Sequence, residues 1–156
     1  MMLARAEKRQ PSVHYEPALL SRIVDVLVVH NDEPVRRFLE FHLRRAGCHV
    51  RLAASEIAAS AHILEAVPHV MVLDIDARGM KCFEFLAGIR ADPVIPFFPV
   101  IYLTADMSAA DCIRELGAAC VHKPIQPEKL LATVASSQIS AIEKFATLNA
   151  SLVKAA

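Results

Sequence analysis

The sequence has few glycines, no paired cysteines and no net charge, and each of these shortages excludes a class of protein. The four glycines, Gly47, Gly79, Gly88 and Gly117, form no Gly-x-Gly or Walker arrangement, which argues against a loop that cradles nucleotide phosphates. The four cysteines are dispersed, as is typical of reduced thiols and not of a disulfide framework or a zinc site. Lysine plus arginine and aspartate plus glutamate both number 17, so we expect no nucleic-acid partner and no polybasic membrane anchor.

Long uncharged segments are also missing. The longest one in the core, residues 93–105, is too short to span a bilayer and contains three prolines. Charged residues and Pro11 interrupt residues 1–22, which leaves no room for the apolar part of a secretory signal. Because 54% of the 156 residues are hydrophobic and only 22% are charged, the sequence predicts one compact domain. We expect it in the cytoplasm, with no membrane partner.

The chain alternates between two hydrophobic patterns. Short apolar runs, typical of buried strands, are each followed by a segment in which apolar residues recur every three or four positions, as in helices. Because each right-handed crossover returns the chain over the sheet, this alternation predicts a parallel sheet between two layers of helices, a three-layer α/β/α sandwich. The expected strands are 23–30, 49–53, 70–74, 99–104 and 119–122, and the expected helices are 35–46, 56–66, 82–90, 108–116 and a long one from 127 onward.

Chemically capable side chains follow the expected strands. Asp32, Asp74, Thr104 and Lys123 come at strand ends, and the carboxyl ends of parallel strands form the functional crevice of such a sheet. Asp32 and Asp74 placed side by side would repel each other unless a cation such as Mg²⁺ lay between them. With a hydroxyl and an ammonium group nearby, Asp74 is placed to act as a nucleophile that receives a phosphoryl group. His30 and His122 also lie at strand ends, but we interpret them as packing residues and leave them out of the site.

Four segments together carry a resemblance to a known family. VLVVHNDEPVRRFL, VMVLDID, PVIYLTA and HKPIQPEKLL resemble the receiver domains of bacterial two-component response regulators, over residues 24–137. The resemblance implies a flavodoxin-like (βα)5 fold with the strand order 2-1-3-4-5. It implies that Asp74 is the phosphorylated aspartate, Thr104 hydrogen-bonds the phosphoryl oxygen and Lys123 pairs with it. It also implies that Asp32, Asp74 and the backbone carbonyl of Asp76 bind Mg²⁺.

The sequence departs from that family at the expected metal site. Asn31 stands where the family usually has the first of two acidic residues. An amide there can orient a metal-bound water from the second shell, but one negative charge is lost, so we expect weaker Mg²⁺ binding. After Asp74, Ala77-Arg78 and Lys81-Cys82 replace the usual turn-forming pairs, which predicts an unusual loop.

We expect the domain to pass on its signal through contacts with other proteins. We divide the chain into an N-terminal extension (1–22), a receiver domain (23–137) and a C-terminal helical extension (138–156), whose apolar stripe predicts a homodimer. The resemblance implies a stand-alone response regulator that is phosphorylated by a histidine kinase or phosphotransfer protein, then acts on a downstream protein, and is not a metabolic enzyme. One alternative is a pseudo-receiver that serves as a phosphorylation-independent interaction module. Another is a flavodoxin-like ligand binder, which the missing phosphate-binding loop disfavours.

Overall fold

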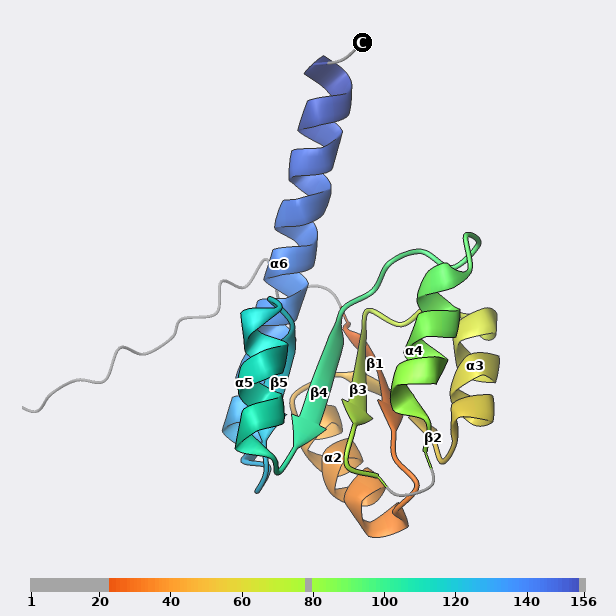
Figure 1. Ribbon diagram of the computed structural model, residues 1–156, viewed down its shortest axis with the longest axis vertical. Coiled ribbons are helices and arrows are strands. Elements are labelled where there is room, and N and C mark those ends of the chain that lie inside the picture. Colours follow the sequence, from red (N-terminus) through yellow and green to blue (C-terminus); the bar gives the residue numbers. More distant parts are fainter. Residues whose placement is uncertain (1–22, 78–79, 155–156) are drawn as a thin grey trace, which may run out of the picture.

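The computed structural model describes residues 23–77 and 80–154 and shows five strands alternating with helices (Figure 1). Each predicted element is present, with ends that differ from the sequence-based ones by one or two residues in most cases. The strands are β1 (Asp25–Val29), β2 (His49–Ala53), β3 (Val70–Asp74), β4 (Val100–Thr104) and β5 (Ala119–His122). The helices are α2 (Glu33–Arg45), α3 (Glu56–Glu65), α4 (Cys82–Ala91), α5 (Met107–Glu115) and α6 (Pro127–Lys154).

The five strands form one parallel sheet in the order β2-β1-β3-β4-β5, which confirms the predicted flavodoxin-like topology. Strand β1 lies between β2 and β3, and the register pairs Val29 with both Ala53 and Leu73. On the other side of β3, the register pairs Asp74 with Leu103 of β4. All five strands therefore end at the same edge of the sheet, where the polar residues of the sequence gather.

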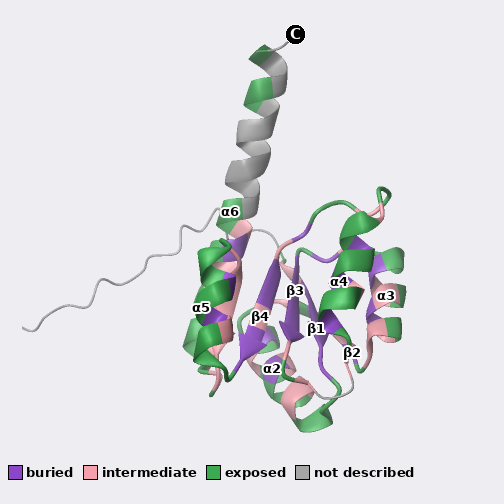
Figure 2. Ribbon diagram, viewed as in Figure 1, coloured by how far each residue is buried: buried purple, intermediate pink, exposed green. Residues whose placement is uncertain are grey.

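Two hydrophobic cores lie on opposite faces of the sheet. Helices α2 and α6 cover one face, with Leu39, Leu43 and Leu130 packed on apolar residues of the strands. Helices α3 and α4 cover the other face, where Ile63 and Leu86 pack in the second core. The central strands are buried from both sides, as Figure 2 shows. Their continuous apolar runs follow from this double burial, because a strand with no solvent-facing side has no place for alternating polar residues.

The start and end of α2 follow from its sequence. Asp32 is the N-cap, and its carboxylate accepts a hydrogen bond from the backbone N–H of Val35. At the other end, Gly47 has a φ of +91°, and the N–H groups of Gly47 and Cys48 donate to the carbonyls of Arg44 and Leu43. Glycine suits this position because a side chain is strained at positive φ. The cap at Asp32 fixes where the loop after β1 turns into the helix.

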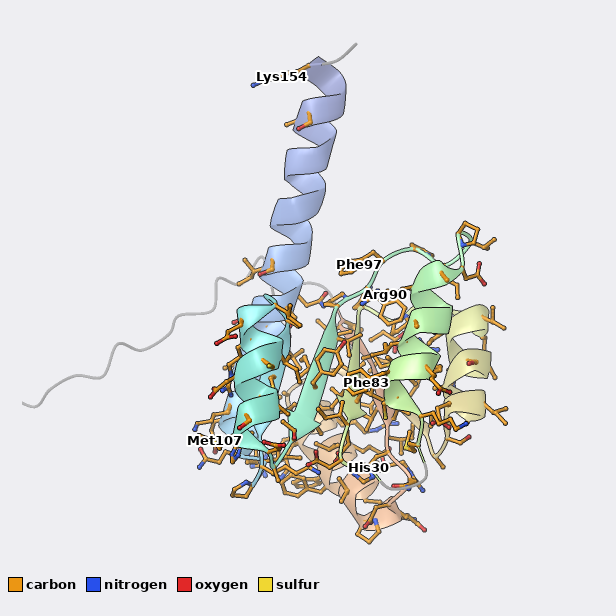
Figure 3. The ribbon with its side chains drawn as sticks, viewed as in Figure 1. His30, Phe83, Arg90, Phe97, Met107 and Lys154 are labelled. Carbon is orange, nitrogen blue, oxygen red and sulfur yellow. The ribbon has the colours of Figure 1, made fainter. Side chains whose placement is uncertain are left out.

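The last helix extends far beyond the sheet. Helix α6 runs without interruption from Pro127 to Lys154, so the predicted boundary at residue 137 falls within one helix. Figures 1 and 3 show it projecting from the end of the domain opposite to His30. No helix in the described ranges is both long and apolar enough to cross a bilayer. The N-terminal extension predicted for residues 1–22 lies outside the described residues.

Candidate functional site

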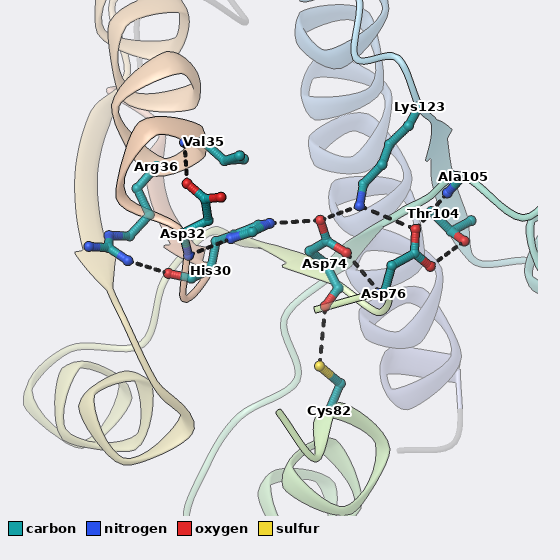
Figure 4. A network of polar contacts seen from close by, with 10 residues as sticks. All are labelled: His30, Asp32, Val35, Arg36, Asp74, Asp76, Cys82, Thr104, Ala105 and Lys123. Carbon is teal, nitrogen blue, oxygen red and sulfur yellow. Dashed lines mark hydrogen bonds and ion pairs between the residues drawn. The ribbon is translucent and has the colours of Figure 1, made fainter. Parts of the chain in front are cut away.

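The carboxyl ends of β1, β3, β4 and β5 bring together the residues of the candidate site (Figure 4). Asp74 ends the central strand β3 and is fully buried, and Thr104 ends β4 and is also fully buried. Lys123 follows β5 directly, and its backbone N–H donates to the carbonyl of Thr104 at 2.8 Å. The structure therefore brings together Asp74, Thr104 and Lys123, as the sequence predicted.

The carboxylate of Asp74 contacts three donors. The ammonium Nζ of Lys123 lies 2.6 Å from its Oδ2, and Nε2 of His30 lies 2.8 Å from the same oxygen. The backbone N–H of Asp76 donates to the other oxygen, Oδ1, at 2.8 Å. The thiol of Cys82, at the start of α4, donates to the backbone carbonyl of Asp74 at 3.2 Å. The carboxylate is thus held in one orientation from three sides.

These contacts determine the charge states of Asp74 and Lys123. Burial is the largest influence on the pKa of Asp74 and raises it, but the hydrogen bonds from His30, Lys123 and Asp76, with the charge of Lys123, together leave it below the usual value. For Lys123, burial lowers the pKa, and its hydrogen bonds and charge interactions with Asp74 and Asp76 outweigh that effect and raise it. Both groups are therefore charged at neutral pH, and the site holds an ionised, buried carboxylate.

Asp76 contributes its side chain as well as the predicted backbone carbonyl. Its Oδ1 accepts a hydrogen bond from the Thr104 hydroxyl at 2.8 Å. Its Oδ2 accepts from the backbone N–H of Ala105 at 2.7 Å and lies 3.2 Å from Nζ of Lys123. Burial raises the pKa of Asp76, but these partners outweigh it and lower the pKa. The hydroxyl of Thr104 is therefore donated to Asp76, and Lys123 bridges the two carboxylates.

Asp32 and Asn31 occupy more peripheral positions than the sequence suggested. Both residues are exposed. Asp32 lines the pocket over Asp74, but its carboxylate caps α2, and its backbone N–H donates to Nδ1 of His30 at 2.9 Å. Asn31 lies in the loop between β1 and α2. The side chain just after β1 that hydrogen-bonds Asp74 is that of His30.

His30 is the residue that the sequence-based interpretation left out. Its side chain is only 8% exposed and contacts Asp74, so its place is in the site. The signal lies in the register: Val29 pairs with Leu73, and His30 and Asp74 are the next residue on each strand. The side chain of His122, in contrast, bonds to the carbonyl of Ala105. Asp106 caps α5 by accepting from the N–H of Ser108.

A pocket of about 520 Å³ opens over the carboxylate. His30, Asp32, Asp74 and Lys123 contribute its polar lining, and Phe38 and Ile125 are among its apolar residues. Within residues 23–77 and 80–154, no three His, Cys, Asp or Glu side chains come together as a group that could hold a metal ion. Asp32 and Asp74 both line this pocket and offer the oxygen ligands that Mg²⁺ prefers.

The fold and the order of these residues along the chain are those of one family. The family model described as "Response regulator receiver domain" matches residues 26–135. The chain belongs to the response regulator receiver domain family. This confirms the resemblance seen in the four sequence segments.

Similar proteins of known sequence or structure agree with this family. The transcriptional regulatory protein GltR of Pseudomonas aeruginosa is 31% identical over 112 residues, which are 70% of this chain and 46% of GltR. A putative response regulator from Chloroflexus aurantiacus is 30% identical, with a TM-score of 0.67 over 76% of this chain and 99% of that one. The chemotaxis response regulator CheY4 of Vibrio cholerae is 28% identical, with a TM-score of 0.65 over 74% and 99% of the two chains. This receiver chain spans about half the length of the curated relatives it matches.

Proposed function

We propose that this receiver domain accepts a phosphoryl group on Asp74 and signals through altered protein contacts. The observation that carries the proposal is the buried, ionised carboxylate of Asp74 beneath an open pocket, with Nζ of Lys123 at 2.6 Å. The nucleophile, the cation and the space for a donor are present at one edge of the sheet. Membership of the receiver family supports the same assignment.

The proposed reaction is an in-line displacement at phosphorus. A carboxylate oxygen of Asp74 attacks the phosphorus of a phosphohistidine, the P–N bond breaks, and the departing imidazole keeps the electron pair and takes up a proton from solvent. Lys123 offsets the charge of the transferring group. In the structure, the Thr104 hydroxyl donates to Asp76 at 2.8 Å. During the transfer it leaves Asp76 and donates to the phosphoryl group instead. The chain is thus a phosphoryl acceptor that catalyses its own modification, and not a metabolic enzyme.

Magnesium dependence stays a prediction for this chain. Receiver domains typically use Mg²⁺, and the residues offered for it here are Asp32, Asp74 and the carbonyl of Asp76, with Asn31 in the second shell. Bound Mg²⁺ would offset negative charge on the transferring phosphoryl group. In the structure, Oδ1 of Asp32 accepts from the N–H of Val35, and Oδ2 of Asp74 contacts His30 and Lys123.

We further propose the partners that such a reaction needs. The donor is a histidine kinase or a phosphotransfer protein, and the acceptor of the signal is a downstream protein, in the cytoplasm. Stand-alone action stays a prediction, because the matched part of this chain is only about half the length of the curated relatives.

A homodimer through α6 is proposed from the shape of the chain. The helix projects from the domain, and Ile139 at the start of the projecting part is 38% exposed. Sedimentation of the full chain over a range of concentrations tests this proposal. We expect a dimer that Ile139→Glu weakens and that Ala132→Glu, at an exposed position nearer the site, leaves unchanged. A monomer at every concentration would contradict it.

The mass of the intact protein after incubation with acetyl phosphate tests phosphoryl acceptance. With Mg²⁺ present, we expect the wild type to gain one phosphoryl group, Asp74→Asn to gain none, and Asp111→Asn, an exposed aspartate on α5, to behave as the wild type. If Asp74→Asn gained as much as the wild type, Asp74 would not be the acceptor. If no protein gained mass and beryllofluoride did not bind, phosphoryl acceptance would be excluded under these conditions.

The second candidate is a phosphorylation-independent interaction module. The observation that favours it is His30, whose ring fills the space beside Asp74 and donates to the oxygen that Lys123 also contacts. A carboxylate so fully hydrogen-bonded is less nucleophilic than one with free lone pairs. A missing mass gain, combined with partner binding that Asp74→Asn does not change, would favour this candidate.

A further inference from the structure

The imidazole of His30 lies against the carboxylate of Asp74, at the expected metal site. His30 is the first residue after β1, and its backbone N–H still donates to the carbonyl of Ala53 at 3.0 Å, as in a continued strand. Arg36 of α2 donates to the carbonyl of His30 at 2.6 Å. These two contacts hold the backbone of His30 on both sides of its Cα atom.

The hydrogen bonds of the ring define its tautomer. Nδ1 lies 2.9 Å from the backbone nitrogen of Asp32, which can only donate, so Nδ1 accepts and carries no proton. A neutral ring then has its proton on Nε2, and this N–H donates to Oδ2 of Asp74 at 2.8 Å. Moving the proton to Nδ1 would set two N–H groups against each other. His30 therefore faces Asp74 as a hydrogen-bond donor.

A hydrogen-bond donor beside Asp74 disfavours the binding of a metal ion there. The ring offers no lone pair toward the carboxylate, because Nε2 carries the proton. Oδ2 already accepts from both His30 and Lys123, and Oδ1 accepts from the N–H of Asp76. A magnesium ion at Oδ2 would have to displace the ring of a residue that is only 7% exposed. The affinity of oxygen-ligand sites rises with the number of charged ligands, and His30 supplies none.

We propose that the His30 imidazole and the Lys123 ammonium hold Asp74 in place of a resident Mg²⁺, so that Mg²⁺ binds this receiver weakly. The proposal rests on the proposed function only in that it concerns the same carboxylate. It predicts an order of Mg²⁺ affinity set by residue 30: histidine weakest, alanine intermediate because the donor is gone, and aspartate strongest because a ligand is added.

Calorimetric titration of the full chain with MgCl₂ alone tests this order. We expect His30→Asp to bind Mg²⁺ at least about tenfold more tightly than the wild type, and His30→Ala to lie between them. His69→Asp is the matched control, because it adds the same charge at an exposed position beside Asp25, at the opposite end of the sheet. We expect it to bind as the wild type does.

Two results would overturn the proposal: a wild type that binds Mg²⁺ as tightly as His30→Asp, or a gain in His69→Asp equal to that in His30→Asp. Circular dichroism shows whether each variant is folded. If His30→Asp is unfolded, the comparison of His30→Ala with the wild type decides, and equal Mg²⁺ affinities of these two proteins would contradict the proposal. The titration contains no phosphodonor, so its outcome is independent of the mass measurement that tests Asp74 as acceptor.

Discussion

Replacing Lys123 by methionine tests how strongly its ammonium group is coupled to the carboxylate of Asp74. The two groups are 2.6 Å apart, and the side chains are 27% and 0% exposed. Methionine retains most of the apolar length of the lysine side chain but has no charge. The loss of stability in Lys123→Met therefore reports the ion pair, with little contribution from a new cavity.

The structure sets the expected magnitude. A hydrogen bond to a charged group contributes about 1.5–3 kcal/mol, and breaking a fully buried pair costs about 3–5 kcal/mol. Water screens Lys123, which is partly exposed, and His30 and the N–H of Asp76 continue to donate to Asp74 in the variant. We therefore expect Lys123→Met to lower the free energy of unfolding by about 1.5–3 kcal/mol.

A double-mutant cycle separates the pair from its surroundings. Lys123→Met, Asp74→Asn and the double variant are unfolded with urea at neutral pH and followed by far-ultraviolet circular dichroism, because the chain has no tryptophan. We expect a coupling free energy of at least about 1 kcal/mol. The same cycle on Arg37 and Glu33, an exposed pair at 2.8 Å, should give a much smaller value.

The reasoning would be refuted by a coupling as small as that of the exposed pair, with unchanged urea dependence in all variants. That result would mean that Lys123 and Asp74 are solvated separately in solution, and that the contact at 2.6 Å does not hold the carboxylate.

The remaining predictions concern acid stability and packing. The pKa values of Asp74 and Asp76 are lowered from 3.8, so their ionised forms stabilise the fold above that pH. This stability is lost as the pH falls through the lowered pKa values. Thermal melts from neutral pH to about pH 3 should show the loss, with a shallower fall in Asp74→Asn. Leu130→Ala removes a fully buried side chain between α6 and the sheet and should cost about 2–5 kcal/mol in urea unfolding; a loss below about 1 kcal/mol would contradict this packing. Arg51→Lys should cost about 1–2 kcal/mol by the same measurement, because one ammonium cannot reach Asp25 and both carbonyls that the guanidinium contacts, His62 in α3 and Ala66 just after it. An unchanged midpoint would contradict this.

The architecture and most of the site could be predicted from the sequence. Alternating strand and helix patterns are local properties of the chain, and right-handed crossovers then leave few topologies. Because parallel strands end at one edge, Asp74, Thr104 and Lys123 had to lie together once the strands were recognised. Their contacts in the structure follow from that rule.

The partners of these residues depended on tertiary structure. Whether Asp32 reaches Asp74 depends on where α2 begins, and the cap at Asp32 directs its carboxylate to the N–H of Val35. The carboxylate of Asp76 holds Thr104 and Lys123 because the loop after β3 turns toward β4, which no local pattern encodes.

His30 shows the difference most clearly. The sequence determined that a histidine follows the first buried strand, and a histidine there is compatible with simple packing. Only the register between β1 and β3 decided that its ring lies beside Asp74, because a shift of one residue would turn the side chain to the other face of the sheet. Strand register is fixed by hydrogen bonds and packing between segments 44 residues apart, and the chemistry of this site depends on it.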